Sequence, residues 1–204
     1  MTLITTLEGL SGKYGCIYAD PAWEHSGNSK KKPGRNPRRH YLTMKPAEVA
    51  TLPVLDYAAD DAFLFLWITG PLLLVGAHLP IFKAWGFKPS SMAFVWVKNT
   101  KKSQQGGFFG PIDNTAFKMN MGHTTRQNAE YCLLGRRGKP KRCNAGIRQV
   151  FCEPQREHSR KPDGIPKLIE SFSGDVRKAE LFARTTRKGW DVWGNETDKF
   201  TELK

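Results

Sequence analysis

The sequence is poor in acidic residues and cysteine and has no long apolar run. Only 19 aspartates and glutamates stand against 32 lysines and arginines, a formal charge of +13. This imbalance favours a polyanionic partner, although many basic proteins bind no nucleic acid. The four cysteines lack a paired C-x-x-C spacing, so we expect a reduced cytoplasmic protein without structural zinc. With neither a signal peptide pattern at the N-terminus nor an apolar run of membrane-spanning length, we expect no secretion and no membrane insertion.

What is present suits one folded domain over residues 1–204, with 39% hydrophobic residues. Short apolar runs predict buried strands at 15–19, 62–68, 94–98, 129–134, 179–183 and 190–193. Helical patterns occupy 45–52, 71–85 and 165–172, and we expect Pro80 to kink the second of these. Strands that alternate with helices predict an α/β fold with a mostly parallel sheet, which binds its ligands at the carboxyl ends of the strands.

Two basic loops, at about 24–44 and 98–128, interrupt this pattern, and no acid occurs between Glu24 and Glu48. Long structureless segments in a compact domain are often functional, so we interpret both loops as target-recognition insertions. A solvated charged loop is the plainer alternative. The side chains that we expect to grip a nucleic-acid backbone are Lys30, Lys31, Lys32, Arg35, Arg38, Arg39, Lys98, Lys101, Lys102 and Arg126.

The first predicted strand ends at Asp20-Pro21-Ala22-Trp23. The exocyclic amine of adenine is a weak nucleophile, because its lone pair is delocalised into the ring. A methylating enzyme must therefore accept hydrogen bonds from this amine and hold the base. The Asp20 carboxylate and the Pro21 carbonyl can accept the two bonds, and Trp23 can stack on an extruded base. A strand followed by Asp-Pro is also a common turn, so the tetrapeptide alone is weak support.

Further motifs in order make the case more specific. They are Tyr18-Ala19-Asp20-Pro21-Ala22-Trp23, Phe63-Leu64-Phe65-Leu66-Trp67, Trp96-Val97-Lys98, Glu130-Tyr131-Cys132-Leu133-Leu134-Gly135, His158-Ser159-Arg160-Lys161-Pro162-Asp163, Glu180-Leu181-Phe182-Ala183-Arg184 and Gly189-Trp190-Asp191-Val192-Trp193-Gly194-Asn195-Glu196. From about Tyr14 to Phe200 the chain resembles the adenine methyltransferases named for the seventy-kilodalton subunit of messenger-RNA adenosine methylase. Their bacterial and phage branch includes small DNA adenine methylases.

The resemblance implies a Rossmann-like fold with helices on both faces of the sheet. It also implies a permuted order, in which the catalytic motif precedes the cofactor half, and S-adenosylmethionine as cofactor. The catalytic residues would be Asp20, Pro21, Ala22 and Trp23. The cofactor would contact Asp20, His158, Lys161, Glu180, Phe182, Arg184, Asn195 and Glu196. Among these, Lys161 would meet the cofactor carboxylate beside a helix start.

Two positions depart from the family pattern. Ala22 replaces the usual second proline, which keeps the backbone carbonyls but loses rigidity and apolar volume. Glu196 stands where some relatives carry glutamine, so this side chain accepts hydrogen bonds but donates none. Neither change removes the expected chemistry.

The leading hypothesis is therefore methylation of the exocyclic amine of adenine, in DNA more than in RNA, inside a bacterial or phage-infected cell. RNA adenosine and the amine of cytosine stay open as alternative substrates, as does a homodimer or a second subunit. A catalytically silent nucleic-acid-binding subunit is a hypothesis of another class, opposed by the joint presence of Asp20, Trp23, Lys161, Glu180 and Asn195. A small-molecule methyltransferase would not need such basic loops.

Overall fold

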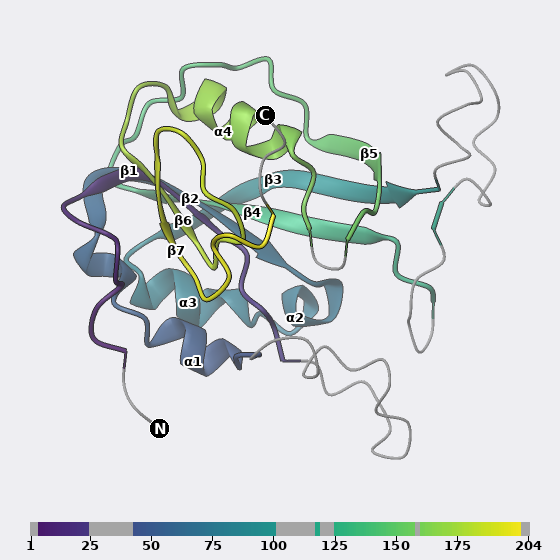
Figure 1. The fold of residues 1–204 in the computed structure, drawn as a ribbon, viewed down its shortest axis with the longest axis horizontal. Coiled ribbons are helices and arrows are strands. Elements are labelled where there is room, and N and C mark those ends of the chain that lie inside the picture. Colours follow the sequence, from purple (N-terminus) through teal and green to yellow (C-terminus); the bar gives the residue numbers. More distant parts are fainter. Residues whose placement is uncertain (1–3, 25–42, 101–116, 119–124, 158–159, 201–204) are drawn as a thin grey trace.

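One sheet forms the centre of the computed structural model, which describes residues 4–24, 43–100, 117–118, 125–157 and 160–200. Its strands follow the spatial order β5-β3-β4-β2-β1-β6-β7 (Figure 1). They are β1 (Tyr14–Ala19), β2 (Ala58–Ile68), β3 (Lys88–Asn99), β4 (Ala129–Arg137), β5 (Val150–Pro154), β6 (Lys178–Leu181) and β7 (Trp190–Trp193).

The predicted mostly parallel sheet is confirmed. The pairs β1–β2, β1–β6, β6–β7 and β3–β5 are parallel. Strand β4 is the exception, because it runs antiparallel to both β2 and β3. As a consequence, the beginning of β4 lies at the same edge of the sheet as the ends of its neighbours. Arg136 and Arg137, at the end of β4, lie at the opposite edge.

Helices cover both faces, as expected. Helix α4 (Gly164–Ser173) lies on one side, and α1 (Pro46–Ala50), α2 (Gly70–Leu74) and α3 (His78–Ala84) lie on the other (Figure 1). Alternate residues of the strands fill two apolar cores. Ile17, Leu64 and Leu66 pack on the side of Val49 and Phe82, from α1 and α3. Tyr18, Phe65 and Trp67 pack on the side of Ile165 and Ile169, from α4.

The predicted helix 71–85 is wrong as a single element. It is two helices separated at Gly76, whose φ of +68° belongs to the left-handed region that glycine adopts without a steric cost. Pro80 does not kink α3, because it lies in the first turn, where a backbone N–H has no partner within the helix. Among the described residues, none of the helices is long and apolar enough to cross a membrane.

The connections leave a crevice between β1 and β6. From β1 the chain passes through α1 to β2 on one side, whereas from α4 it enters β6 and continues to β7 on the other side. Two neighbouring parallel strands whose connections diverge form a topological switch point. Ligands of open α/β sheets bind at such points, outside the carboxyl ends of the strands.

Candidate active site

Four neighbouring strands bring polar and aromatic groups to one edge of the sheet, on the side that α4 covers. Tyr18, Trp67, Trp96 and Cys132 all belong to the core on that side. Side chains two residues apart along a strand share a face. Asp20, Lys98 and Glu130 therefore lie on the same side as these four residues. Across β3, β4, β2 and β1, the row reads Lys98, Glu130, Trp67, Asp20.

Lys161, three residues before α4, completes the row with a shared ion pair. Its Nζ lies 2.7 Å from both carboxylate oxygens of Asp20 and 3.1 Å from Oε2 of Glu130. Glu130 also pairs with the ammonium of Lys98. Between the two carboxylates, the ammonium of Lys161 lies over the ring of Trp67, 5.3 Å from its centroid. The charged groups therefore alternate in sign in the order Lys98, Glu130, Lys161, Asp20. Lys161 lies between the two carboxylates.

Burial and this sharing shift the pKa values of Asp20, Glu130 and Lys161. Burial raises the pKa of Asp20, and Lys161 offsets only part of the effect because Glu130 adds a like charge. Burial also opposes ionisation of Glu130, but Lys161 and Lys98 together overcome it and lower its pKa to about 2. For Lys161, the two carboxylates overcome burial and raise the pKa above its usual range. Asp20 is thus the member of the row closest to taking up a proton.

Trp67 links this row to the segment Asp20-Pro21-Ala22-Trp23. Its backbone carbonyl accepts a hydrogen bond from Nε1 of Trp23 at 3.0 Å, and its own indole N–H donates to the hydroxyl of Tyr18 at 2.9 Å. Trp23 is only 5% exposed. Its indole packs in the core and braces the segment, and the stacking of an extruded base on Trp23 stays a prediction.

Beyond Trp23, the segment is held by Met44. The Met44 N–H donates to the carbonyl of Ala22 at 2.8 Å, and the N–H of Glu24 donates to the carbonyl of Met44 at 2.9 Å. The carbonyl of Ala22 is thus engaged, and that of Pro21 stays the predicted second acceptor for an amine. A proline at position 22, as in the family pattern, would have the same backbone carbonyl. The hydrogen bond from Met44 therefore does not depend on whether residue 22 is alanine or proline.

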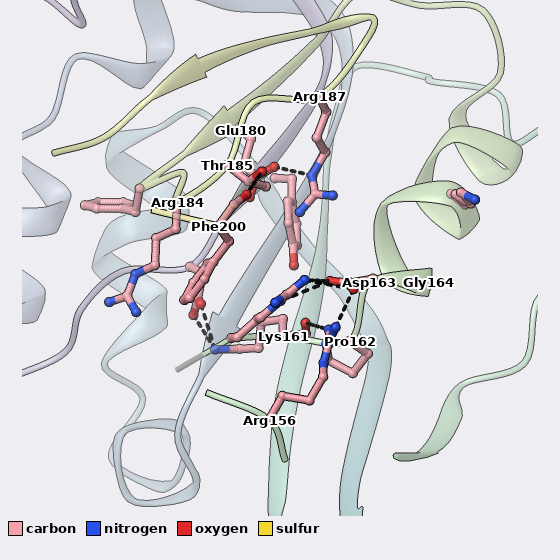
Figure 2. A pocket seen from close by; sticks show the side chains of 15 residues that line it. Arg156, Lys161, Pro162, Asp163, Gly164, Glu180, Arg184, Thr185, Arg187 and Phe200 are labelled. Carbon is pink, nitrogen blue, oxygen red and sulfur yellow. Dashed lines mark hydrogen bonds and ion pairs between the residues drawn. The ribbon is translucent and has the colours of Figure 1, made fainter. Parts of the chain in front are cut away.

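A cavity of about 570 Å³ opens beside Asp20, between the ends of β1 and β6 and the start of α4. Figure 2 shows Glu180 and Arg187 at one end of the cavity and Lys161, Arg156 and Asp163 at the other. Its volume lies within the range typical of small-molecule sites, roughly 300–1,000 Å³. Its lining is rich in charge, with the cations Arg156, Arg160, Lys161, Lys167, Arg184 and Arg187 and the acids Asp20, Asp163 and Glu180.

Glu180 is a buried acid on β6, and Arg187 is its partner. Nε of Arg187 lies 2.8 Å from Oε2 of Glu180, and the two side chains are 16% and 10% exposed. Burial raises the pKa of Glu180, although Arg187 counteracts it. This pair explains how an acid is tolerated inside an apolar strand. The carboxylate lines the cavity and can accept hydrogen bonds from ligand hydroxyl groups.

The turn after β6 has an unusual backbone. Phe182 has a φ of +61°, rare for a residue with a side chain. Its ring meets that of Trp193 edge to face at 5.2 Å, and the N–H of Ala183 donates to the carbonyl of Trp193 at 2.9 Å. A side chain at Gly194 would lie 2.5 Å from the carbonyl oxygen of Ala183. Contacts with the end of β7 thus hold Phe182 in its strained backbone conformation in the cavity wall. Strained backbone of this kind is common at functional sites.

The predicted cofactor residues are largely brought together. Asp20, Lys161, Glu180, Phe182 and Arg184 line the cavity. Glu196 reaches Arg184, with 3.8 Å between Oε2 and Nε. The exposed Asn195 is absent from the described lining residues, and His158 lies outside the described residues.

Sequence reasoning missed several residues near the site. Glu130 belongs to one of the family motifs, but only the reversed direction of β4 brings it beside Lys98 and Lys161. Arg156 and Arg160, which both pair with Asp163, gave no signal in the sequence. Phe200 also lines the cavity, beneath the guanidinium of Arg160 at 5.1 Å from its ring centroid.

The predicted nucleic-acid contacts are mostly outside the described residues; these are Lys30, Lys31, Lys32, Arg35, Arg38, Arg39, Lys101 and Lys102. Arg126 is exposed. The prediction for Lys98 as a backbone-gripping loop residue is wrong. Lys98 lies inside β3 and is 8% exposed, with its ammonium on Glu130 and above the ring of Trp96.

Comparison with known proteins identifies the family of this chain. The family model described as MT-A70 matches residues 14–196. The Type II methyltransferase M.MunI of a Mycoplasma species is 32% identical over 205 residues, which cover 90% of this chain and 78% of that protein. The N(6)-adenosine-methyltransferase catalytic subunit METTL3 of Homo sapiens is 31% identical over 192 residues, 92% of this chain but only 29% of its own length. The chain belongs to the MT-A70 family of adenine N6-methyltransferases.

Proposed function

We propose that this protein transfers a methyl group from S-adenosylmethionine to the exocyclic amine of adenine in DNA. The observation that carries the proposal is the position of Asp20. It ends a central strand at the rim of a cavity large enough for the cofactor, in a chain of the MT-A70 family. A base presented from outside the sheet would meet Asp20 from one side, and a cofactor in the cavity would meet it from the other.

The residues of the cavity fit S-adenosylmethionine. Lys161, close to the start of α4, would hold its carboxylate, and Asp20 would accept from its ammonium group. Glu180 would accept from the ribose hydroxyls, and Phe182 and Phe200 supply apolar surface for the adenine ring. When bound, the cofactor supplies an activated methyl group on its sulfonium.

The catalytic segment would then orient the amine. The carboxylate of Asp20 and the carbonyl of Pro21 would accept hydrogen bonds from its two N–H groups, which favours a pyramidal nitrogen with an available lone pair. Once it carries the methyl group, the nitrogen would release one of these protons. The bonds of Trp23 to Trp67 and of Ala22 to Met44 keep these acceptors in place. Such positioning and the exclusion of water are the main contributions a protein can make to a transfer of this kind.

We favour DNA as the substrate because the chain matches a larger share of M.MunI than of METTL3. The chain spans 78% of M.MunI, a Type II methyltransferase, but less than a third of METTL3. RNA adenosine is the second candidate, which the METTL3 similarity favours. The same amine chemistry serves both polymers, so the choice rests on recognition outside the pocket.

The proposal is tested by transfer of labelled methyl groups from S-adenosylmethionine to unmethylated duplex DNA and to RNA, with the modified nucleoside identified by mass spectrometry. We expect N6-methyldeoxyadenosine in DNA. Label confined to RNA would change the substrate and keep the chemistry. Absence of transfer to either polymer, in protein that binds S-adenosylhomocysteine, would refute the proposal in favour of a silent subunit.

A further inference from the structure

Glu130 stands behind the catalytic carboxylate without reaching the cavity. Among the described lining residues of the cavity, both Glu130 and its partner Lys98 are absent, whereas Lys161 and Asp20 are present. Glu130 touches Lys161 at 3.1 Å, and its side chain is 21% exposed. Whatever Glu130 does to a ligand in the cavity, it therefore does through Lys161.

Lys161 is shared between Asp20 and Glu130, and this sharing indicates what the contact with Glu130 does. Lys161 places its ammonium equally on both oxygens of Asp20, at 2.7 Å each. The proposed reaction needs those oxygens for the substrate amine and for the cofactor, so Asp20 must give up part of this pairing. A buried ammonium needs a partner at every stage of binding, and the proposed cofactor carboxylate supplies one to Lys161 only once it is bound. Glu130 offers the second partner, and the ring of Trp67 below supports the charge between the two carboxylates.

We propose that Glu130 is a positioning residue, which retains the ammonium of Lys161 over Trp67 when Asp20 turns to its substrate. This inference rests on the proposed function for the identity of that substrate. Lys98 contributes to the same arrangement through its ion pair with Glu130. It keeps Glu130 ionised, and it competes with Lys161 for Glu130, so that Lys161 stays paired with Asp20. Three contacts in series, Lys98–Glu130, Glu130–Lys161 and Lys161–Asp20, thus set how strongly Lys161 binds Asp20.

The two ends of the series predict opposite effects on Asp20. In Glu130→Gln, Lys161 would bind Asp20 alone and a like charge would be gone, so the pKa of Asp20 would fall. In Lys98→Met, Glu130 would take a larger share of Lys161, so the pKa of Asp20 would rise. A residue that only filled space would move neither value.

The other groups near Asp20 do not change between these variants. Electrostatic interactions connect Asp20 with Arg184 and Glu180, and with Tyr18 and Cys132 on β1 and β4. Burial raises the pKa values of Tyr18 and Cys132 well above their usual ranges, so both stay neutral. Glu180 is present in every variant, so its effect on the Asp20 titration is the same in the control variant.

The experiment is a titration of the Asp20 carboxyl by carbon-13 NMR in cofactor-free protein, combined with calorimetric binding of S-adenosylhomocysteine. Glu153→Gln on neighbouring β5 is the control, because it removes a carboxylate without touching Lys161. We expect opposite shifts of the Asp20 midpoint in Glu130→Gln and Lys98→Met, and about tenfold weaker binding in Glu130→Gln. Glu130→Asp, which keeps the charge, should restore most of the binding.

An Asp20 midpoint that matches the control in both variants would overturn the inference, as would shifts of the same sign. Neither readout needs methyl transfer. Failure of the proposed function would appear separately, as folded wild-type protein that transfers no methyl group to DNA or RNA.

Discussion

Removal of Arg187 is expected to leave the buried Glu180 without its 2.8 Å partner. In Arg187→Met the arginine stem is roughly replaced in volume, so the main loss is charge compensation around a carboxylate that is 10% exposed. Removal of one partner of a buried ion pair typically costs about 3–5 kcal/mol. Because each kcal/mol lowers the melting temperature of a domain this size by roughly 2–4 °C, we expect a decrease of at least about 6 °C at pH 8.

The loss should depend on pH with a definite sign. Burial already raises the pKa of Glu180 in the folded protein, and loss of Arg187 would raise it further. A folded state that holds a proton more tightly than the unfolded chain loses stability as pH rises from the unfolded pKa through the folded one. Arg187→Met should therefore be less destabilised at pH 5 than at pH 8, because protonated Glu180 needs no cation.

Thermal and urea unfolding of wild type, Arg187→Met and Arg187→Met/Glu180→Gln at both pH values test this reasoning. The double variant removes the unpaired charge, so it should recover most of the stability at pH 8 and lose the pH dependence. A single variant equally destabilised at pH 5 and pH 8, with no recovery in the double variant, would refute the assignment of the loss to Glu180.

Three further outcomes are expected. Gly194→Ala should lower the melting temperature, because the new Cβ would lie 2.5 Å from the oxygen of Ala183, and overpacking of this kind costs about 1–3 kcal/mol; an unchanged unfolding curve would contradict the close contact. Trp23→Phe should cost about 1–2 kcal/mol by removing the indole hydrogen bond to the carbonyl of Trp67, measured by urea unfolding, and wild-type stability would show that this bond contributes little. Lys161→Met should weaken S-adenosylhomocysteine binding at least about tenfold in calorimetry, and unchanged affinity would remove Lys161 from the cofactor site.

The parts of the fold that follow from local pattern were predicted well. Continuous apolar runs identified the strands now called β1, β2, β3, β4, β6 and β7, and the spacing of Ile165 and Ile169 identified α4. Strand β5 was missed because it is a short edge strand with no buried residue, so it has no apolar run. The break at Gly76 was missed because the apolar spacing of the two short helices continues across it.

The site shows a similar limit. Five residues expected from the family resemblance, Asp20, Lys161, Glu180, Phe182 and Arg184, line one cavity, but the sequence did not show how they pair. The row from Lys98 to Asp20 depends on β4 lying between β2 and β3 in reverse direction, a contact order that no local pattern encodes. Lys98 was misplaced for a local reason: a lysine at the end of a predicted strand looks like the first residue of a basic loop.

The central claim is that Asp20 acts on the amine of adenine, and Asp20→Asn tests it most directly. Asparagine keeps the size of the side chain but removes its charge and one acceptor. The account predicts N6-methyldeoxyadenosine from the wild type and at least about a hundredfold lower single-turnover rate from Asp20→Asn, with S-adenosylhomocysteine binding reduced by less than that factor. Methyl transfer by Asp20→Asn at the wild-type rate, at saturating cofactor and DNA, would contradict the account.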